Sequence, residues 1–141
     1  MKKEMTNVMI KLDSDTIQKL AIFESITRTN LKDCIEDEDE IYFIVNSKDL
    51  GKAIGKSAIN IKALEKKFRK KIILIGFEQD PKDFAINLLK PMNVKSMSIE
   101  NEALIITIFA SSKNFPSKKV KKAKMLLTKY FNNIKNVIIK V

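Results

Sequence analysis

Apolar residues recur at helical spacing from about Ser14 to Thr29, and this period predicts a helix. Asp13 or Ser14 can cap it, because short polar side chains accept hydrogen bonds from the first free backbone N–H groups of a helix. A helix is therefore the first element that the pattern predicts. The face expected to be buried includes Ile17, Leu20 and Ala21, with Phe23 or the neighbours of Glu24 as further candidates.

Two runs rich in β-branched and aromatic residues follow, LKDCIE at 31–36 and EIYFIVN at 40–46, and both predict strands. Acidic residues between them favour a hairpin turn. The acidic cluster at 37–40 could invite a metal, but it lacks a spaced ligand framework and fits a solvated turn. Cys34 fits a buried strand residue better than a reactive thiol.

A short helix at about 48–54, a glycine turn and a longer helix are expected next. In the longer helix, Ile61, Leu64 and Phe68 share the inward face, because steps of three and four residues lie on one side of a helix. The nearly continuous apolar run KIILIGF at 71–77 predicts a strand in a central or doubly covered position.

The same order of elements then begins again. Asp80 is a good N-cap, Pro81 suits the first helical turn, and the helix should stop near Pro91. The further expected elements are strands at 94–100 and 103–110, a lysine-rich helix from about Ser117 to Phe131, and a strand at 136–141.

The chain of 141 residues is thus predicted to be an α+β protein built from a tandem repeat. The expected units are residues 1–78 and 79–141. Each is short for an independent domain, so we expect the two to pack into one body.

The charge is uneven between these two units. The chain carries 27 Lys and Arg against 17 Asp and Glu, a net charge of +10. The first unit is close to neutral, at +2, and the second carries +8. A strongly basic chain indicates a polyanionic partner, of which nucleic acid is the commonest. No apolar run is long enough to span a membrane, so a cytoplasmic protein without a membrane partner is expected.

Two of the chain's three glycines, Gly51 and Gly55, lie in the stretch LGKAIGKSAINIKALEKKF. Glycine between lysines at the start of a helix lets the backbone approach a ligand, and free N–H groups of the next helix attract phosphate. The alternative is that both glycines merely shape a turn between helices.

The segment AIGKSAINIKAL resembles the KH domain, whose GxxG loop joins two helices and clamps a nucleic-acid backbone. The order αββααβ resembles the type II KH arrangement. Two such units, with AIFESITRTNLKDCIEDED upstream of the loop, resemble the archaeal NusA-like transcription factors. The resemblance implies a non-catalytic factor that binds single-stranded nascent RNA during transcription elongation or termination. It alone implies RNA polymerase as a partner.

The loop expected from this resemblance is Gly55-Lys56-Ser57-Ala58, with alanine where the second glycine belongs. Alanine is small and compatible with a helix, so the loop can survive. Bases would lie in a groove beside it. The residues predicted to contact RNA are Ile54, Gly55, Lys56, Ser57, Ala58, Ile61, Lys62, Lys118, Lys119 and Lys122.

The second unit is expected to be degenerate. Aligning Val120 with Ile61 places NFPS, residues 114–117, where the loop should be, and neither glycine remains there. Its lysine cluster at 118–124 either attracts RNA or is only a solvated face.

An enzyme is the least favoured class. The chain has no histidine and no nucleotide-binding loop, because only three residues separate Gly51 from Gly55 where GxxxxGK[ST] needs four. No catalytic residue, metal or cofactor is predicted. Two rivals remain: another KH-type module associated with the ribosome or RNA processing, and a degenerate KH scaffold for protein contacts.

Overall fold

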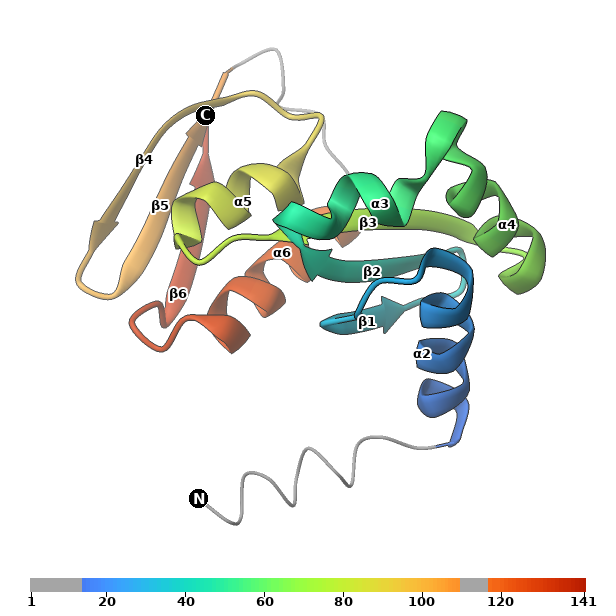
Figure 1. Cartoon of the computed structure of the whole chain (residues 1–141). Helices are drawn as coiled ribbons and strands as arrows, with labels where there is room; N and C mark the ends of the chain where they lie inside the picture. Colours follow the sequence, from blue (N-terminus) through green and yellow to red (C-terminus); the bar gives the residue numbers. More distant parts are fainter. Residues whose placement is uncertain (1–13, 110–116) are drawn as a thin grey trace. The chain divides into compact units, whose positions relative to one another are not determined.

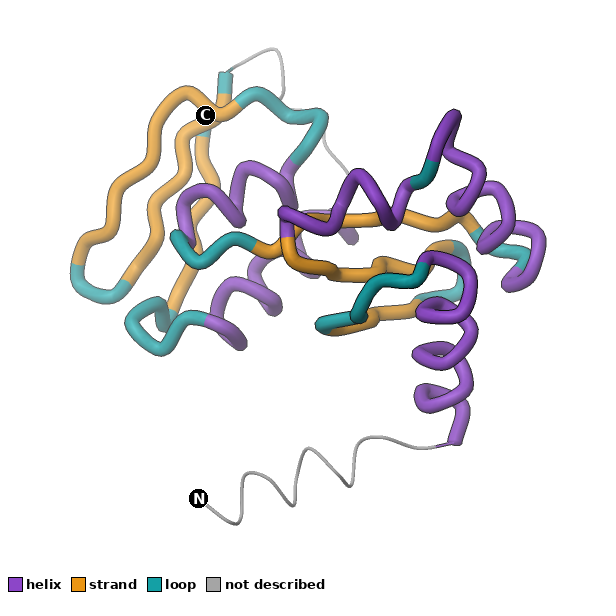
Figure 2. Tube along the Cα trace, viewed as in Figure 1, coloured by secondary structure: helices purple, strands orange, loops and turns teal. Residues whose placement is uncertain are grey.

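The computed structural model describes residues 14–109 and 117–141, and it divides the chain into two compact units, 1–77 and 78–141 (Figure 1). Each unit combines helices with a small three-stranded sheet (Figure 2). The α+β class predicted from the sequence is therefore confirmed. Packing of the two units into one body stays a prediction.

The first unit contains α2 (Ser14–Thr27), β1 (Asp33–Glu36), β2 (Glu40–Asn46), α3 (Leu50–Ile54), α4 (Ile59–Phe68) and β3 (Lys71–Phe77). Short 3₁₀ turns, η1 (Ser47–Asp49) and η2 (Lys56–Ala58), precede α3 and α4. The predicted hairpin is confirmed, because β1 pairs antiparallel with β2. The strand β3 pairs parallel with β2, and the sheet order is β1-β2-β3.

Of the two alternatives predicted for residues 71–77, a central or a doubly covered position, the central one is wrong. The middle strand is β2, whose residues Ile41–Val45 are all buried, whereas β3 lies at an edge. Both strands are apolar, and hydrophobicity alone does not tell a central strand from a well-covered edge strand. The position of β3 follows from its parallel pairing with β2, which the α3–α4 crossover allows.

The helix α2 buries only part of the face predicted for it. Ile17 is 53% exposed and Ala21 is also exposed, whereas Lys19 and Phe23 are buried. Phe23 packs on Phe43 with ring centroids 4.6 Å apart, and this contact fixes the inward face. Lys19 can be buried on that face because Asp15 and Glu36 both pair with it.

The core of the first unit draws on every helix of the unit and on two of its strands. Its buried members are Phe23, Ile41, Phe43, Val45, Ala53, Leu64 and Ile72. Cys34 packs against this core, and burial raises the pKa of its thiol to about 12. The thiol is therefore protonated at neutral pH, which agrees with its prediction as a structural strand residue.

The second unit contains α5 (Pro81–Leu89), β4 (Val94–Glu100), β5 (Ala103–Ile108), α6 (Ser117–Tyr130) and β6 (Asn136–Lys140). The predicted cap is confirmed, because the Asp80 carboxylate accepts a hydrogen bond from the Lys82 N–H. The middle strand β5 pairs antiparallel with β4 and parallel with β6, as β2 does with its neighbours. The repeat predicted from element order is therefore visible in the strand pairing.

Candidate nucleic-acid interface

The loop at 55–58 joins the end of α3 to the start of α4. The Gly55 N–H donates to the Gly51 carbonyl and closes α3, and the Ala58 N–H donates to the Gly55 carbonyl across the loop. Lys56 and Ser57 are exposed at its tip. The Ile59 N–H, the first of α4, donates to the Lys56 carbonyl, so the feature that this tip presents to solvent is the Lys56 cation.

Three loop residues have positive φ: Gly55 at 80°, Ser57 at 53° and Ala58 at 58°. Positive φ is unusual for residues other than glycine. Ser57 and Ala58 therefore hold a backbone that glycine adopts more easily. Ala58, predicted to be tolerated because alanine is small and compatible with a helix, adopts the left-handed conformation just before α4 begins.

Gly55 has a steric as well as a conformational requirement. A Cβ at this position would lie 2.9 Å from both Asn60 Nδ2 and Ile59 Cγ2. Gly51, by contrast, is helical and has no atom within 4 Å of the position that its Cβ would take. The two glycines of the motif are therefore not equivalent, and only Gly55 is required by the loop.

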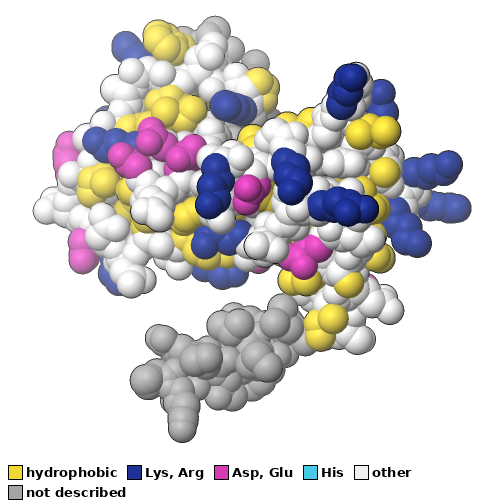
Figure 3. All heavy atoms as spheres, in the orientation of Figure 1, with side chains coloured by type: hydrophobic (Ala, Val, Ile, Leu, Met, Phe, Trp, Pro, Cys, Tyr) yellow, Lys and Arg dark blue, Asp and Glu magenta, His cyan; other side chains and the backbone are white. Residues whose placement is uncertain are grey.

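Positive charge is concentrated on the helices that flank this loop. Residues 47–69 carry seven Lys and Arg and two acidic side chains, a net charge of +5, although the whole first unit is nearly neutral. Lys52, Lys56 and Lys62 are all exposed. Dark blue side chains gather over α3 and α4 in the space-filling view (Figure 3). The first unit thus presents a local cationic surface that its total charge conceals.

The predicted apolar contacts lie on either side of the loop, at the end of α3 and in the first turn of α4. Ile54 ends α3 and is partly buried, and Ile61 in α4 is partly buried against the core. Ile59 lies closer to the loop and is 61% exposed. Sequence spacing identified Ile61 but missed Ile59, whose position directly after the loop is the signal that could have found it.

Lys52 is a second residue that the sequence prediction missed. It lies in α3, four residues before Lys56 of the loop, and its place beside the glycine motif was visible in the sequence. Its side chain is exposed, and its carbonyl oxygen accepts a hydrogen bond from Asn60 Nδ2 at 3.2 Å. Lys52 therefore adds charge beside the loop and also takes part in the contact between α3 and α4.

The three lysines of the basic helix α6 that are predicted to bind RNA differ in their exposure to solvent. Lys118 is exposed and Lys119 is partly exposed, whereas Lys122 is only 8% exposed. Lys122 lies beside Ala123 and one turn before Leu126, on the face of α6 that is buried, and a lysine stem can pack in such a place. Lys121 and Lys124, which are not among the residues predicted to contact RNA, are exposed. Residues 114–116 of the NFPS segment lie outside the described residues.

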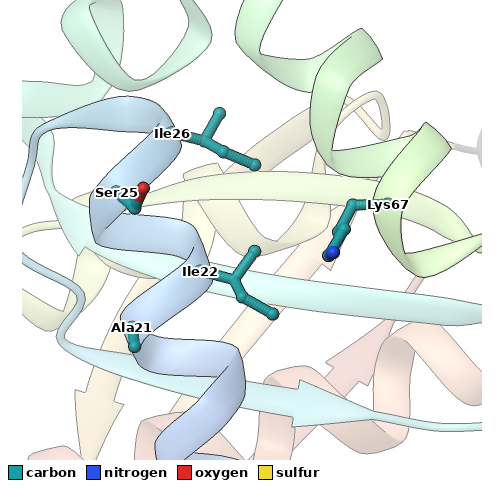
Figure 4. Close-up of a pocket in the computed structure, with 5 residues that line it drawn as sticks. All are labelled: Ala21, Ile22, Ser25, Ile26 and Lys67. Atoms are coloured by element: carbon teal, nitrogen blue, oxygen red, sulfur yellow. The ribbon is translucent and has the colours of Figure 1, made fainter.

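A hollow of about 370 Å³ lies elsewhere in the first unit, between α2 and α4 (Figure 4). Its lining is Ala21, Ile22, Ser25, Ile26 and Lys67, and the Lys67 side chain points toward α2. None of the ten residues predicted to contact RNA lines it.

Within 14–109 and 117–141, no cluster of three or more potential metal ligands is found, and no helix there is long and apolar enough to cross a membrane.

The chain is similar to several archaeal proteins named probable transcription termination protein NusA. The protein of Methanococcus vannielii is 36% identical over 91 residues, which cover 64% of this chain and 53% of the relative. The protein of Methanocaldococcus jannaschii is 30% identical over 71% of this chain and 55% of the relative. The protein of Thermoplasma acidophilum is 28% identical over 87% of this chain and 91% of its own length.

These similarities support an archaeal NusA-like protein. The chain spans about half the length of the first two curated relatives that it matches. No protein-family model matches it. A solved structure described as "Crystal structure of APE1850" superposes on the NusA-like chain with a TM-score of 0.70 at 26% identity, covering 87% of this chain and 96% of that one.

Proposed function

We propose that this NusA-like chain is a non-catalytic RNA-binding factor that acts in transcription elongation or termination. In this proposal, the first unit is a type II KH domain that binds single-stranded RNA. The loop at 55–58 holds the RNA backbone. RNA polymerase is the protein partner that the resemblance implies.

The observation that carries the proposal is the backbone of the loop. Gly55, Ser57 and Ala58 keep positive φ although two of them are not glycine. Such a conformation is costly for residues with a Cβ, and strained backbone tends to cluster at functional sites. Arg28 and Arg69, each just after a helix, also have positive φ, so what distinguishes the loop is three such residues within four positions.

Charge supports phosphate as the ligand of this loop. Lys52, Lys56 and Lys62 surround it, and the N-terminus of α4 adds the partial positive charge of its dipole. Contacts of this kind neutralise phosphates without reading bases, so affinity should depend strongly on salt. Exposed Ile59 and partly buried Ile54 offer apolar surface on which bases can pack.

The arrangement of elements supports the KH assignment. The first unit runs αββααβ, with an antiparallel hairpin followed by a parallel third strand. The described part of the second unit repeats the strand pairing but carries neither glycine of the loop. The first unit is therefore the RNA-binding unit of the proposal, and the second contributes charge.

A titration with labelled single-stranded RNA at low salt tests the proposal, with duplex RNA as competitor. The loop variant combines Lys56→Asp with Ser57→Asp, which sets two negative charges at the phosphate position. We expect its affinity to fall at least about tenfold, which needs only about 1.4 kcal/mol.

The matched control combines Lys95→Asp with Ser96→Asp, an exposed Lys-Ser pair in β4 that makes the same change in net charge. This control should lose less affinity than the loop variant. Equal losses would show that only net charge matters. Undiminished binding by the loop variant, or no RNA binding by the parent, would favour a scaffold for protein contacts.

A further inference from the structure

Asn60 lies in the first turn of α4 and reaches back to α3 across the loop. Its Nδ2 donates a hydrogen bond to the Lys52 carbonyl oxygen at 3.2 Å. That carbonyl belongs to the last turn of α3, where carbonyl groups lack partners within the helix. One side chain therefore connects the end of α3 to the start of α4.

The same side chain packs beneath Gly55. A Cβ on Gly55 would come within 2.9 Å of Asn60 Nδ2 and 3.0 Å of Asn60 Cγ. Real Cβ contacts are essentially never closer than 3.0 Å, so the absence of a side chain at Gly55 makes room for the Asn60 amide. Gly55 and Asn60 thus form a matched pair within the loop.

The loop needs such support because it holds two residues in the left-handed region. Ser57 and Ala58 have φ of 53° and 58°, and each such residue costs roughly 1–2 kcal/mol when it carries a Cβ. The loop's own backbone bond, from the Ala58 N–H to the Gly55 carbonyl at 3.1 Å, joins the two ends of the loop. The Asn60 bond adds an anchor from outside it.

We propose that Asn60 is the positioning residue of the loop: its amide holds α3 and α4 together and so keeps Ser57 and Ala58 in the conformation that binds the ligand. The choice of RNA as that ligand rests on the function proposed above. The effect on the loop itself does not, and it can be observed in the free protein.

The test compares Asn60→Ala in two backgrounds. In the parent, the variant should lower affinity for single-stranded RNA by about fivefold, as expected for the removal of one hydrogen bond. In a Ser57→Gly/Ala58→Gly background, the same substitution should cost less than about twofold, because glycine adopts positive φ without help. Asn133→Ala, at an exposed position in the turn after α6, is the control and should change neither background.

A second readout needs no RNA. A residue with positive φ gives a strong intraresidue NOE between its amide and α protons, so this signal for Ala58 should weaken in Asn60→Ala and persist in Asn133→Ala. A loss of affinity of equal size in both backgrounds would identify Asn60 as a direct RNA contact and overturn the proposal. An unchanged Ala58 signal would also overturn it. If the parent does not bind RNA, the proposed function fails, while the NOE still decides the role of Asn60.

Discussion

Lys19 of α2 forms an ion pair with Glu36 of β1, with Nζ 2.8 Å from Oε1. Lys70, just before β3, reaches the other oxygen of the same carboxylate at 2.6 Å. Glu36 therefore links the first helix of the unit to the segment that follows α4. The Lys19 side chain is only 11% exposed, so the pair is shielded from solvent on one side.

This network predicts an acid-sensitive first unit. Burial raises the pKa of Glu36, but hydrogen bonds from Lys19 and Lys70 outweigh it and hold the pKa below the ordinary 4.5. A lowered carboxyl pKa contributes stability above the unfolded value and loses it as pH falls through the folded value. Urea unfolding from pH 7 to 3 should show the free energy of unfolding falling below about pH 4.5. Glu36→Gln should lower the free energy of unfolding by about 1 kcal/mol at pH 7 and should reduce its fall below pH 4.5. If the free energy of unfolding falls with pH in this variant as it does in the parent, Glu36 does not have this role.

The two glycines of the motif should respond in opposite ways to alanine. Gly55→Ala places a Cβ against Ile59 and Asn60 at positive φ, so affinity for single-stranded RNA should fall at least about tenfold. Gly51→Ala meets no atom and should raise helix stability by about 0.5–1 kcal/mol without changing affinity. Titration at matched salt and thermal unfolding measure both effects. Parent-like RNA binding by Gly55→Ala would make the motif a structural turn.

Ala58→Gly should stabilise the protein, although glycine normally weakens a helix. The native φ of 58° strains the backbone of alanine, and glycine removes this strain. The removal of strain should outweigh the extra conformational entropy that glycine gives the unfolded chain, so the free energy of unfolding should rise by about 0.5 kcal/mol. The matched control is Ala63→Gly, the same substitution at an exposed helical position of α4, which should cost about 1 kcal/mol. Denaturant midpoints compare the two. A loss of the same size in both variants would mean that residue 58 is helical.

The exposed lysines of α6 should contribute long-range attraction to RNA. Replacing Lys118, Lys119 and Lys121 together with Gln should reduce the slope of log affinity against log salt, by about 0.7 for each phosphate on a single strand that is no longer neutralised. Lys122→Gln should leave the slope unchanged, because this side chain is 8% exposed and packs within the unit. If the triple variant keeps the parent slope, the exposed face is merely solvated.

Most of the elements could be predicted from sequence because their signals are local. The cap at Asp80, the period of the helices and the β-branched runs each depend on neighbouring residues. The hairpin β1–β2 needed only a short acidic turn. The position of β3 at the sheet edge could not be predicted, because strand order depends on a crossover rather than on the strand's own residues.

In the candidate site, too, local sequence signals predicted some features and not others. Gly55 and its lysines could be found from a motif, but the left-handed Ser57 and Ala58 could not, since neither residue type predicts positive φ. The burial of Lys19 and Lys122 could not be predicted from the hydrophobic pattern either, because that pattern treats every lysine as a polar surface residue. Lys19 is buried because Asp15 and Glu36, separate in sequence, both pair with it.

The central claim is that the loop at 55–58 contacts the RNA backbone. Titrating the isotopically labelled full chain with single-stranded RNA and following every backbone amide by NMR tests it most directly. We predict that the largest saturable shifts fall on the amides from Gly55 to Ile59, with smaller, salt-sensitive shifts on α6. Saturable shifts confined to residues outside α3, the loop and α4 would contradict the account.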